Sequence, residues 1–182
     1  MDQHFNFWHA LQCYEVVKHY FHPKYWDELY HSLWYTFNCD VIAPDYLIQG
    51  PHAMPSGSGW TNFLETVFNF ILVQYLKLKF HLPIEVAMGI GDDQLWMMNN
   101  EPSEKLTQFI VDQFCLFGLD ANPEKQEVST YIASFLQRRS YAFWSPKGIQ
   151  YAGVYPTIRA LTSEVYPEFY HNEKEWTKNT FA

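Results

Sequence analysis

The segment 84–100, IEVAMGIGDDQLWMMNN, constrains the fold more than any other, because two apolar runs meet in it at a Gly-Asp-Asp turn. Such a turn between strand-like runs is typical of a β-hairpin, since glycine readily takes the positive φ that tight turns require. Ala87 and Gly89 alternate with larger apolar residues along the first run. These small residues predict that one face of the hairpin packs closely against another element.

The rest of the chain alternates helical and strand-like patterns. Apolar residues recur at helical spacing in several segments, and Gly- and Pro-rich stretches separate them. We predict helices over 5–20, 24–38, 60–80, 103–117 and 157–167, and strands within 39–60, near 126–137 and near 141–152, in addition to the hairpin. This order predicts an α+β fold in which helices pack on one face of a mainly antiparallel sheet.

The helix expected over 60–80 has a signal at each end. Asn62 and Glu65 have the spacing of a capping box at its start. Pro83 marks its stop, because proline cannot continue a helix. The helix follows a loop, MPSGSGWT, that is rich in glycine and serine.

Composition limits the broad class. The chain has 182 residues, of which 48% are hydrophobic, enough for one sizeable core. We expect neither a membrane span nor a signal peptide, because charged or polar residues interrupt every apolar run and the start lacks a basic segment. The three cysteines, Cys13, Cys39 and Cys115, are predicted to be buried free thiols in a reducing compartment. The eight histidines show no metal-ligand spacing.

Charge restricts the function further. The net charge of -8 argues against a free-standing nucleic-acid-binding protein, whose footprint is normally a basic patch. Any role with a polynucleotide must therefore explain this deficit of cations.

The adjacent carboxylates of Asp92 and Asp93 allow two interpretations. They are either ordinary turn residues that face water or ligands of a divalent cation such as Mg²⁺, whose charge removes their mutual repulsion. A glycine-rich loop at a helix start offers N–H groups and hydroxyls to phosphate or sugar. The loop, the helix and the carboxylate hairpin together indicate nucleotidyl transfer assisted by two metal ions.

The order of these motifs resembles the palm domain of viral RNA-dependent RNA polymerases, especially those of partitivirus- and picobirnavirus-like viruses. MPSGSGWTNFLETVFN is similar to their motif B and GIGDDQLW to motif C. FGLDANPEKQEVS resembles motif D, YIASFLQRR resembles motif E, and PTIRALTSEVYPE resembles the segment that leads into the thumb. MDQHFN at the start is similar to the end of motif A. The resemblance covers nearly the whole chain.

The resemblance implies catalytic roles for three residues. Asp92 would be the main ligand of Mg²⁺ or Mn²⁺, with Asp93 as a weaker or second partner. Lys125 would be the motif D lysine that protonates the leaving pyrophosphate as a general acid.

The resemblance also implies residues that bind substrates. Asp2 would contact the ribose 2′-hydroxyl of the incoming nucleotide, which distinguishes RNA precursors from DNA precursors. Ser56, Gly57 and Thr61 would position the template and the nucleotide. Asn69 matches another position of the family pattern, where it would either bind the nucleotide or serve packing only. Arg138 and Arg139 would lie near the RNA primer backbone or serve solubility at the surface.

Two departures from the family pattern stand out. Glu65 occupies the position where several relatives have an asparagine that reads the ribose, so either Glu65 or Asn69 would take that role. The first aspartate of motif A, the basic fingers and most of the thumb are not in this chain. This accounts for the acidic net charge and leads us to expect that the chain alone does not polymerise nucleotides.

The implied organisation is a palm over residues 1–137, with the rest of motif E and the start of the thumb over 138–182. The implied partners are an RNA template, a primer or nascent strand, nucleoside triphosphates and the missing parts of the polymerase. The implied location is the host cytoplasm or the inside of a viral particle.

Two alternatives stay open from the sequence. One is an acidic α+β interaction domain without catalysis, in which Gly-Asp-Asp is only a turn. The other is a reverse-transcriptase-like palm, although that family has an aromatic residue and alanine before the two aspartates, where this chain has Ile90 and Gly91.

Overall fold

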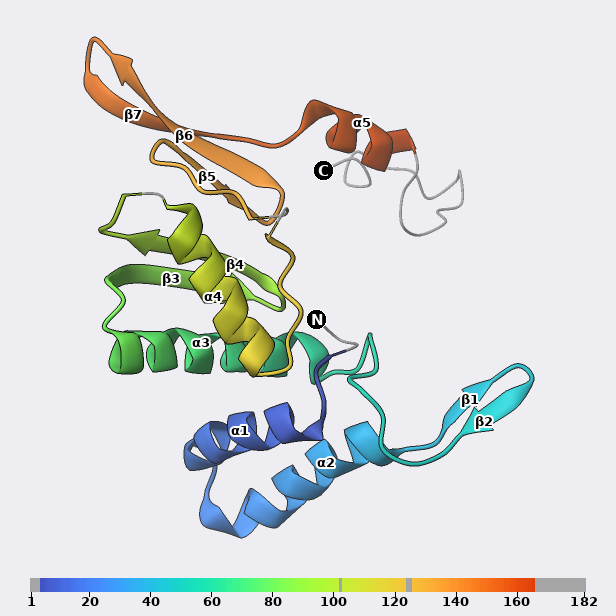
Figure 1. Ribbon diagram of the computed structural model, residues 1–182. Helices are drawn as coiled ribbons and strands as arrows, with labels where there is room; N and C mark the ends of the chain where they lie inside the picture. The colour runs from blue at the N-terminus through green and yellow to red at the C-terminus, as the bar shows by residue number, and fades with distance from the viewer. Residues whose placement is uncertain (1–3, 102, 124–125, 166–182) are drawn as a thin grey trace. The chain divides into compact units, whose positions relative to one another are not determined.

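The computed structural model describes residues 4–101, 103–123 and 126–165 (Figure 1). The chain forms two compact units, one up to Val128 and one from Ser129 onward. All strand pairings among the described residues are antiparallel, and helices accompany them, so the predicted α+β class is confirmed. The strands lie in three sheets, with two, two and three strands.

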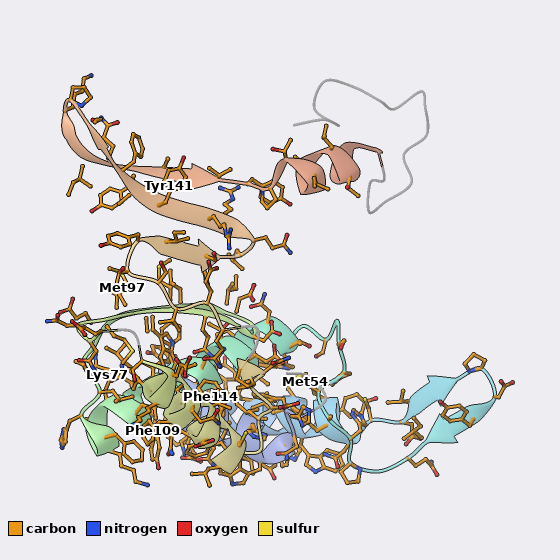
Figure 2. All side chains as sticks on the ribbon, turned by 45° about the horizontal axis from the view of Figure 1, so that its top comes forward. Met54, Lys77, Met97, Phe109, Phe114 and Tyr141 are labelled. Atoms are coloured by element: carbon orange, nitrogen blue, oxygen red, sulfur yellow. The ribbon has the colours of Figure 1, made fainter. Side chains whose placement is uncertain are left out.

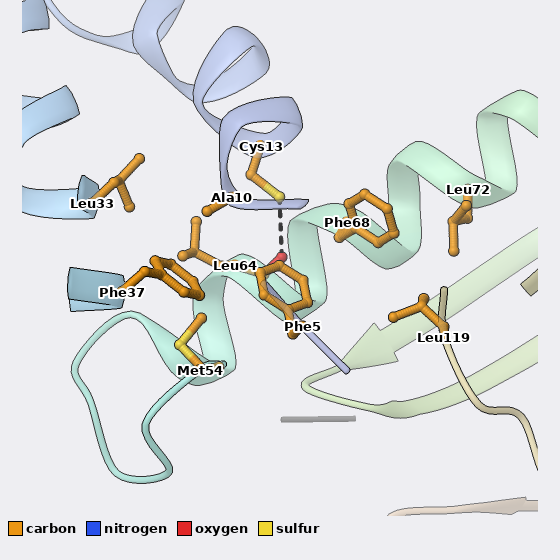
Figure 3. Close-up of a cluster of buried hydrophobic side chains, with 10 residues drawn as sticks. All are labelled: Phe5, Ala10, Cys13, Leu33, Phe37, Met54, Leu64, Phe68, Leu72 and Leu119. Carbon is orange, nitrogen blue, oxygen red and sulfur yellow. Dashed lines mark hydrogen bonds between the residues drawn. The ribbon is translucent and has the colours of Figure 1, made fainter. Parts of the chain in front are cut away.

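Three helices build the main core of the first unit. They are α1 (Phe7–Val17), α2 (Trp26–Asn38) and α3 (Thr61–Phe80), and short 3₁₀ turns at Lys18–Tyr20 and Pro23–Tyr25 join α1 to α2. Their apolar faces enclose one buried cluster, drawn in Figure 3: Phe5, Ala10, Cys13, Leu33, Phe37, Met54, Leu64, Phe68, Leu72 and Leu119. Burial of this cluster supplies the apolar free energy that holds the helices together.

The predicted hairpin is present, as β3 (Ile84–Ile90) and β4 (Asp93–Met98). Its strands pair from Ile84 opposite Met98 to Ile90 opposite Asp93. One face packs on α3, where Ile84 joins Val73 and Leu76 in a second core cluster and Ala87 lies against it. The close packing predicted from the small residues of β3 is thus confirmed, because α3 lies directly under that face.

The predicted capping box of α3 is wrong. Trp60 is the N-cap and its side chain makes no capping bond, while Glu65 is buried within the unit. The helix start is held instead by a turn, in which the Ser58 N–H and the Thr61 hydroxyl both donate to the carbonyl of Pro55, each over 3.0 Å. The predicted stop is confirmed, since α3 ends at Phe80.

Two further elements complete the first unit. The hairpin of β1 (Val41–Ala43) and β2 (Tyr46–Ile48) lies in the expected 39–60 segment. The helix α4 (Glu104–Leu116) packs on the region of α3 and β4, with Phe109 and Phe114 at the contact (Figure 2). The ring centroids of Phe109 and Phe80 lie 5.0 Å apart in an edge-on arrangement, and those of Phe114 and Trp96 lie 6.1 Å apart. At its end, Leu119 N–H donates to the Phe114 carbonyl in a Schellman motif.

The second unit contains three strands rather than the two predicted strand segments. They are β5 (Ile132–Phe135), β6 (Arg138–Ser145) and β7 (Gly148–Val154), which form one sheet in that order and are followed by α5 (Thr157–Val165). A turn between Ser145 and Gly148 divides the segment predicted as one strand near 141–152. The functional boundary expected between residues 137 and 138 stays a prediction.

Candidate active site

The turn of the β3–β4 hairpin carries the two candidate metal ligands. Ile90 pairs with Asp93, so Gly91 and Asp92 are the two central residues of the turn. Gly91 has φ of +55°, and a positive φ at the first central position is the arrangement for which glycine is preferred in two-residue hairpins. The side chains of Asp92 and Asp93 are exposed. The turn therefore presents both carboxylates to solvent.

Polar side chains of α3 hold this turn from below. The Gly91 N–H donates to the Thr66 hydroxyl oxygen over 2.8 Å, and the Asn69 side-chain amide donates to the Gly91 carbonyl. Asn69 is 2% exposed. Both backbone groups of Gly91 are thus satisfied by one helix, which fixes the turn relative to α3.

Glu65 lies under the same turn. It is 3% exposed, and its Oε2 lies 3.7 Å from the place that a Cβ on Gly91 would occupy. Glu65 and Asn69, the two candidates for reading the ribose, both face the underside of the hairpin in this unit. Their assignment to ribose recognition stays a prediction.

The glycine-rich loop lies at the start of the same helix. Ser56 and Gly57 are exposed, and Gly57 has φ of +86°. Met54, at the beginning of the loop, is buried, and its N–H donates to the Phe5 carbonyl over 2.8 Å. The loop is thereby anchored to the core, while its tip and Thr61 lie at the N-terminal end of α3.

The carboxylates of Asp92 and Asp93 have the chemistry of metal ligands. Neither forms an ion pair with any residue that the structure describes, and hard carboxylate oxygens are the ligands that Mg²⁺ prefers. Across the described ranges, no group of three or more potential ligands comes together. The two residues therefore fit as part of a divalent-cation site that needs further ligands.

The remaining predicted site residues lie elsewhere. Asp2 and Lys125 fall outside the described residues. Arg138 and Arg139 belong to β6 in the second unit, where Arg138 pairs with Phe135 and Arg139 with Ser134. Since successive side chains of a strand point to opposite faces, the two arginines lie on opposite faces of the sheet.

The thiols depart in part from the expectation. Cys13 is buried, and its thiol donates a hydrogen bond to the Leu64 carbonyl with an Sγ–O distance of 3.3 Å (Figure 3). Burial raises the pKa of Cys13 to about 12, so the thiol stays protonated. Cys39 is half-buried, and Cys115 is exposed on α4, which makes the prediction of burial wrong for Cys115.

Comparison with known proteins identifies the family. Residues 8–146 match the sequence model of the family described as viral RNA-dependent RNA polymerase. The chain belongs to this family. A solved structure of this family has a similar fold. The crystal structure of the RNA-dependent RNA polymerase of a human picobirnavirus superposes on this chain with a TM-score of 0.76 and 26% sequence identity. The superposition covers 99% of this chain and 34% of that one.

Two curated relatives agree with this family. A potential RNA-dependent RNA polymerase of Human picobirnavirus (strain Human/Thailand/Hy005102/-) is 31% identical over 128 residues, which are 70% of this chain and 23% of the relative. The RNA-directed RNA polymerase of Cryptosporidium parvum virus 1 is 25% identical over 145 residues, 76% of this chain and 25% of the relative. The chain spans about a quarter of the length of these polymerases.

Sequence reasoning missed Thr66 as a residue that contacts the turn of the β3–β4 hairpin. Asn62, Glu65, Thr66 and Asn69 have the i, i+3, i+4, i+7 spacing of one helical face. This polar stripe among the apolar residues of the first half of α3 was the available signal.

Proposed function

We propose that this chain is the catalytic palm segment of a viral RNA-dependent RNA polymerase and serves template-directed RNA synthesis. The observation that carries the proposal is the hairpin turn, which presents the exposed carboxylates of Asp92 and Asp93 and is bonded to α3 through Gly91.

Asp92 and Asp93 would hold the divalent cations, Mg²⁺ or Mn²⁺. When bound, such ions activate the 3′-hydroxyl of the nascent strand and stabilise the leaving pyrophosphate. The turn supplies two carboxylates in a fixed place, and the exposed loop with Ser56 and Gly57 lies at the start of the helix that supports them. Thr61, whose hydroxyl donates to Pro55, would keep this loop in shape.

The other substrate roles follow from the motif positions. Asp2 would bind the ribose of the incoming nucleoside triphosphate, and Lys125 would donate a proton to the pyrophosphate. We expect the chain by itself not to synthesise RNA, because its match covers only 23% and 25% of the two curated relatives and because, among the described residues, no third ligand joins Asp92 and Asp93. The full reaction would take place where viral RNA is copied, in the host cytoplasm or inside a particle.

The second unit would contact the RNA strands. From Val128 to Ser163 the sequence has no Asp or Glu, and it has the cations Arg138, Arg139, Lys147 and Arg159. This local excess of positive charge suits a phosphate backbone, in contrast to the acidic chain as a whole.

Titration of Mn²⁺ into the chain tests the proposed metal site. We expect Asp92→Asn to weaken Mn²⁺ binding about tenfold or more, as measured by the water proton relaxation rate, because it removes one anionic ligand. Asp45→Asn, which removes an exposed carboxylate at the β1–β2 turn, serves as the control and should bind Mn²⁺ as the unmodified chain does. Equal affinity for both variants would favour the interaction-domain alternative.

A further inference from the structure

The turn of the β3–β4 hairpin contains two backbone groups that the strands cannot satisfy. The ladder ends at the pair Ile90 and Asp93, so the N–H and the carbonyl of Gly91 lie beyond it. Both groups are bonded by side chains of α3: Thr66 accepts from the N–H over 2.8 Å, and Asn69 donates to the carbonyl. Because these residues are three apart, they lie on one face of the helix and reach the same residue of the turn.

The chemical groups at both positions are matched to their partners. The Thr66 hydroxyl donates to the Asn62 carbonyl of its own helix over 2.7 Å, so its lone pairs are available to the Gly91 N–H. Asn69 must present its amide nitrogen, since a carbonyl only accepts. Asn69 is almost completely buried, and its position is therefore set by packing.

One stripe of α3 supports the whole hairpin. Val73 and Leu76 lie under the base of the strands with Ile84, and Thr66 and Asn69 contact the turn at the other end. The stripe is apolar beneath the strands, where side chains pack, and polar beneath the turn, where backbone groups need partners. The polar residues are thus placed at the turn, where the backbone groups of Gly91 have no partner in the ladder.

We propose that Thr66 and Asn69 are positioning residues of the polymerase site, which act on the metal ligands through Gly91. They bind neither metal nor substrate in this proposal. They hold the two peptide units that flank the Gly91 Cα, and with them the backbone that carries Asp92 and Asp93, in the conformation that receives the cation. This inference rests on the proposed function, because it takes the two aspartates to be the metal ligands.

A pair of nearly isosteric variants tests Thr66. Thr66→Val keeps the shape and removes the hydroxyl, whereas Thr66→Ser keeps the hydroxyl. We expect Thr66→Val to weaken Mn²⁺ binding about tenfold, because the cation must then order a looser turn, and we expect Thr66→Ser to restore affinity to within about twofold. Thr36→Val on α2 is the matched control, since Thr36 makes the same hydroxyl bond to its own helix, to Ser32, without any bond to the hairpin.

Hydrogen exchange of the Gly91 amide gives a second readout that does not depend on metal. The amide should be protected in the unmodified chain and in Thr66→Ser, and should exchange about tenfold faster in Thr66→Val. Asn69→Asp, which replaces the amide donor by an acceptor, should also weaken Mn²⁺ binding.

The outcomes separate the two proposals. If Asp92→Asn abolishes Mn²⁺ binding but Thr66→Val and Asn69→Asp bind as tightly as the unmodified chain, the positioning role is refuted. If the unmodified chain binds no Mn²⁺ at the turn while Thr66→Val still loosens the Gly91 amide, the metal site is refuted and the support of the turn by α3 stands. Should Thr66→Val fail to fold, an unprotected Gly91 amide in the unmodified chain would by itself overturn the inference.

Discussion

His9 shows at the scale of one residue how a buried polar group joins distant segments. Its Nδ1 accepts from the Asn6 N–H over 3.0 Å at the start of α1, and its Nε2 donates to the Phe117 carbonyl over 2.7 Å at the end of α4. These two bonds require the neutral imidazole with its proton on Nε2. Burial is the largest influence and lowers the pKa of His9, in agreement with the neutral form.

The pH dependence of stability follows from this shift. Because the pKa of His9 is lowered in the folded chain, the unfolded chain binds more protons once the pH falls below the ordinary histidine value of about 6.5. The stabilisation by His9 is therefore complete above that pH and decreases as the pH falls toward the lowered pKa.

We predict that His9→Leu destabilises the chain by about 2–3 kcal/mol at pH 7.5, since it leaves the Asn6 N–H and the Phe117 carbonyl without these partners. The difference from the unmodified chain should become smaller at pH 5.5. Urea unfolding at both pH values measures it. A difference that is independent of pH would contradict the neutral, buried imidazole.

Glu65 is the residue at which local sequence reasoning failed. Its spacing from Asn62 fits a capping box, yet α3 rotates it under the hairpin, beside Gly91. The backbone groups at a helix start that a capping box would bond can bond water instead, so losing the box costs little. The burial of neighbouring Leu64 and Phe68 against α1 fixes the rotation of the whole helix. The tertiary contacts therefore decided which way Glu65 points.

At the scale of elements, the β5–β6 turn carries backbone strain. Leu136 and Gln137 have φ of +48° and +63°. Two-residue hairpin turns with positive φ at both positions prefer Asn-Gly, because a Cβ lies too close to the following carbonyl oxygen in this conformation, and glycine lacks a Cβ while asparagine can offset the cost by local hydrogen bonding. The strand pairing on either side, from Phe135 opposite Arg138, maintains the turn.

We predict that Leu136→Asn combined with Gln137→Gly stabilises this hairpin by about 1–2 kcal/mol. Amide hydrogen exchange of β5 and β6 should slow by about tenfold. Lys147→Asn in the β6–β7 turn, where φ of residue 147 is not positive, is the control and should give no gain. Faster exchange in the double variant would contradict the strain.

At the scale of the whole molecule, charge is divided between segments. The acidic net charge belongs to the segments that carry Asp92 and Asp93, while the stretch from Val128 to Ser163 has cations only. The acidic net charge of the whole chain, which argued against a nucleic-acid role, therefore does not extend to the sheet in the second unit. Among the residues that the structure describes, no helix is long and apolar enough to cross a membrane.

The two faces of that sheet should differ in RNA binding. Arg139 shares its face with Tyr141 and Phe143, whose rings lie 6.0 Å apart, and a guanidinium beside aromatic rings suits the phosphates and bases of a single strand. We predict that Arg139→Ala weakens binding of single-stranded RNA about fivefold and that Arg138→Ala, on the opposite face, weakens it less.

Fluorescence anisotropy with a labelled oligonucleotide at low salt measures this difference. Lys105→Ala on α4 removes an exposed cation from the first unit and controls for net charge. Equal losses for the two arginine variants would show that both faces, or neither, meet the RNA.

The sequence by itself determined what depends on neighbours along the chain. Local conformational preference and spacing predict the glycine of the hairpin turn, the apolar period of α3 and its stop before Pro83. The order of the motifs was assigned by their resemblance to viral RNA-dependent RNA polymerases. These signals also predicted a turn at Gly91-Asp92-Asp93, where the structure exposes both carboxylates, and their role as metal ligands stays a prediction.

Only the tertiary structure decided which side chains face one another. The rotation of α3 brings Thr66 and Asn69 to Gly91 and buries Glu65, and the register of β6 places Arg138 opposite Phe135 and Arg139 opposite Ser134. The physical reason is that helix rotation and strand register are set by packing between segments far apart in sequence. The residue pattern of one segment predicts which residues share a face, whereas the tertiary structure decides which residues of other segments that face contacts.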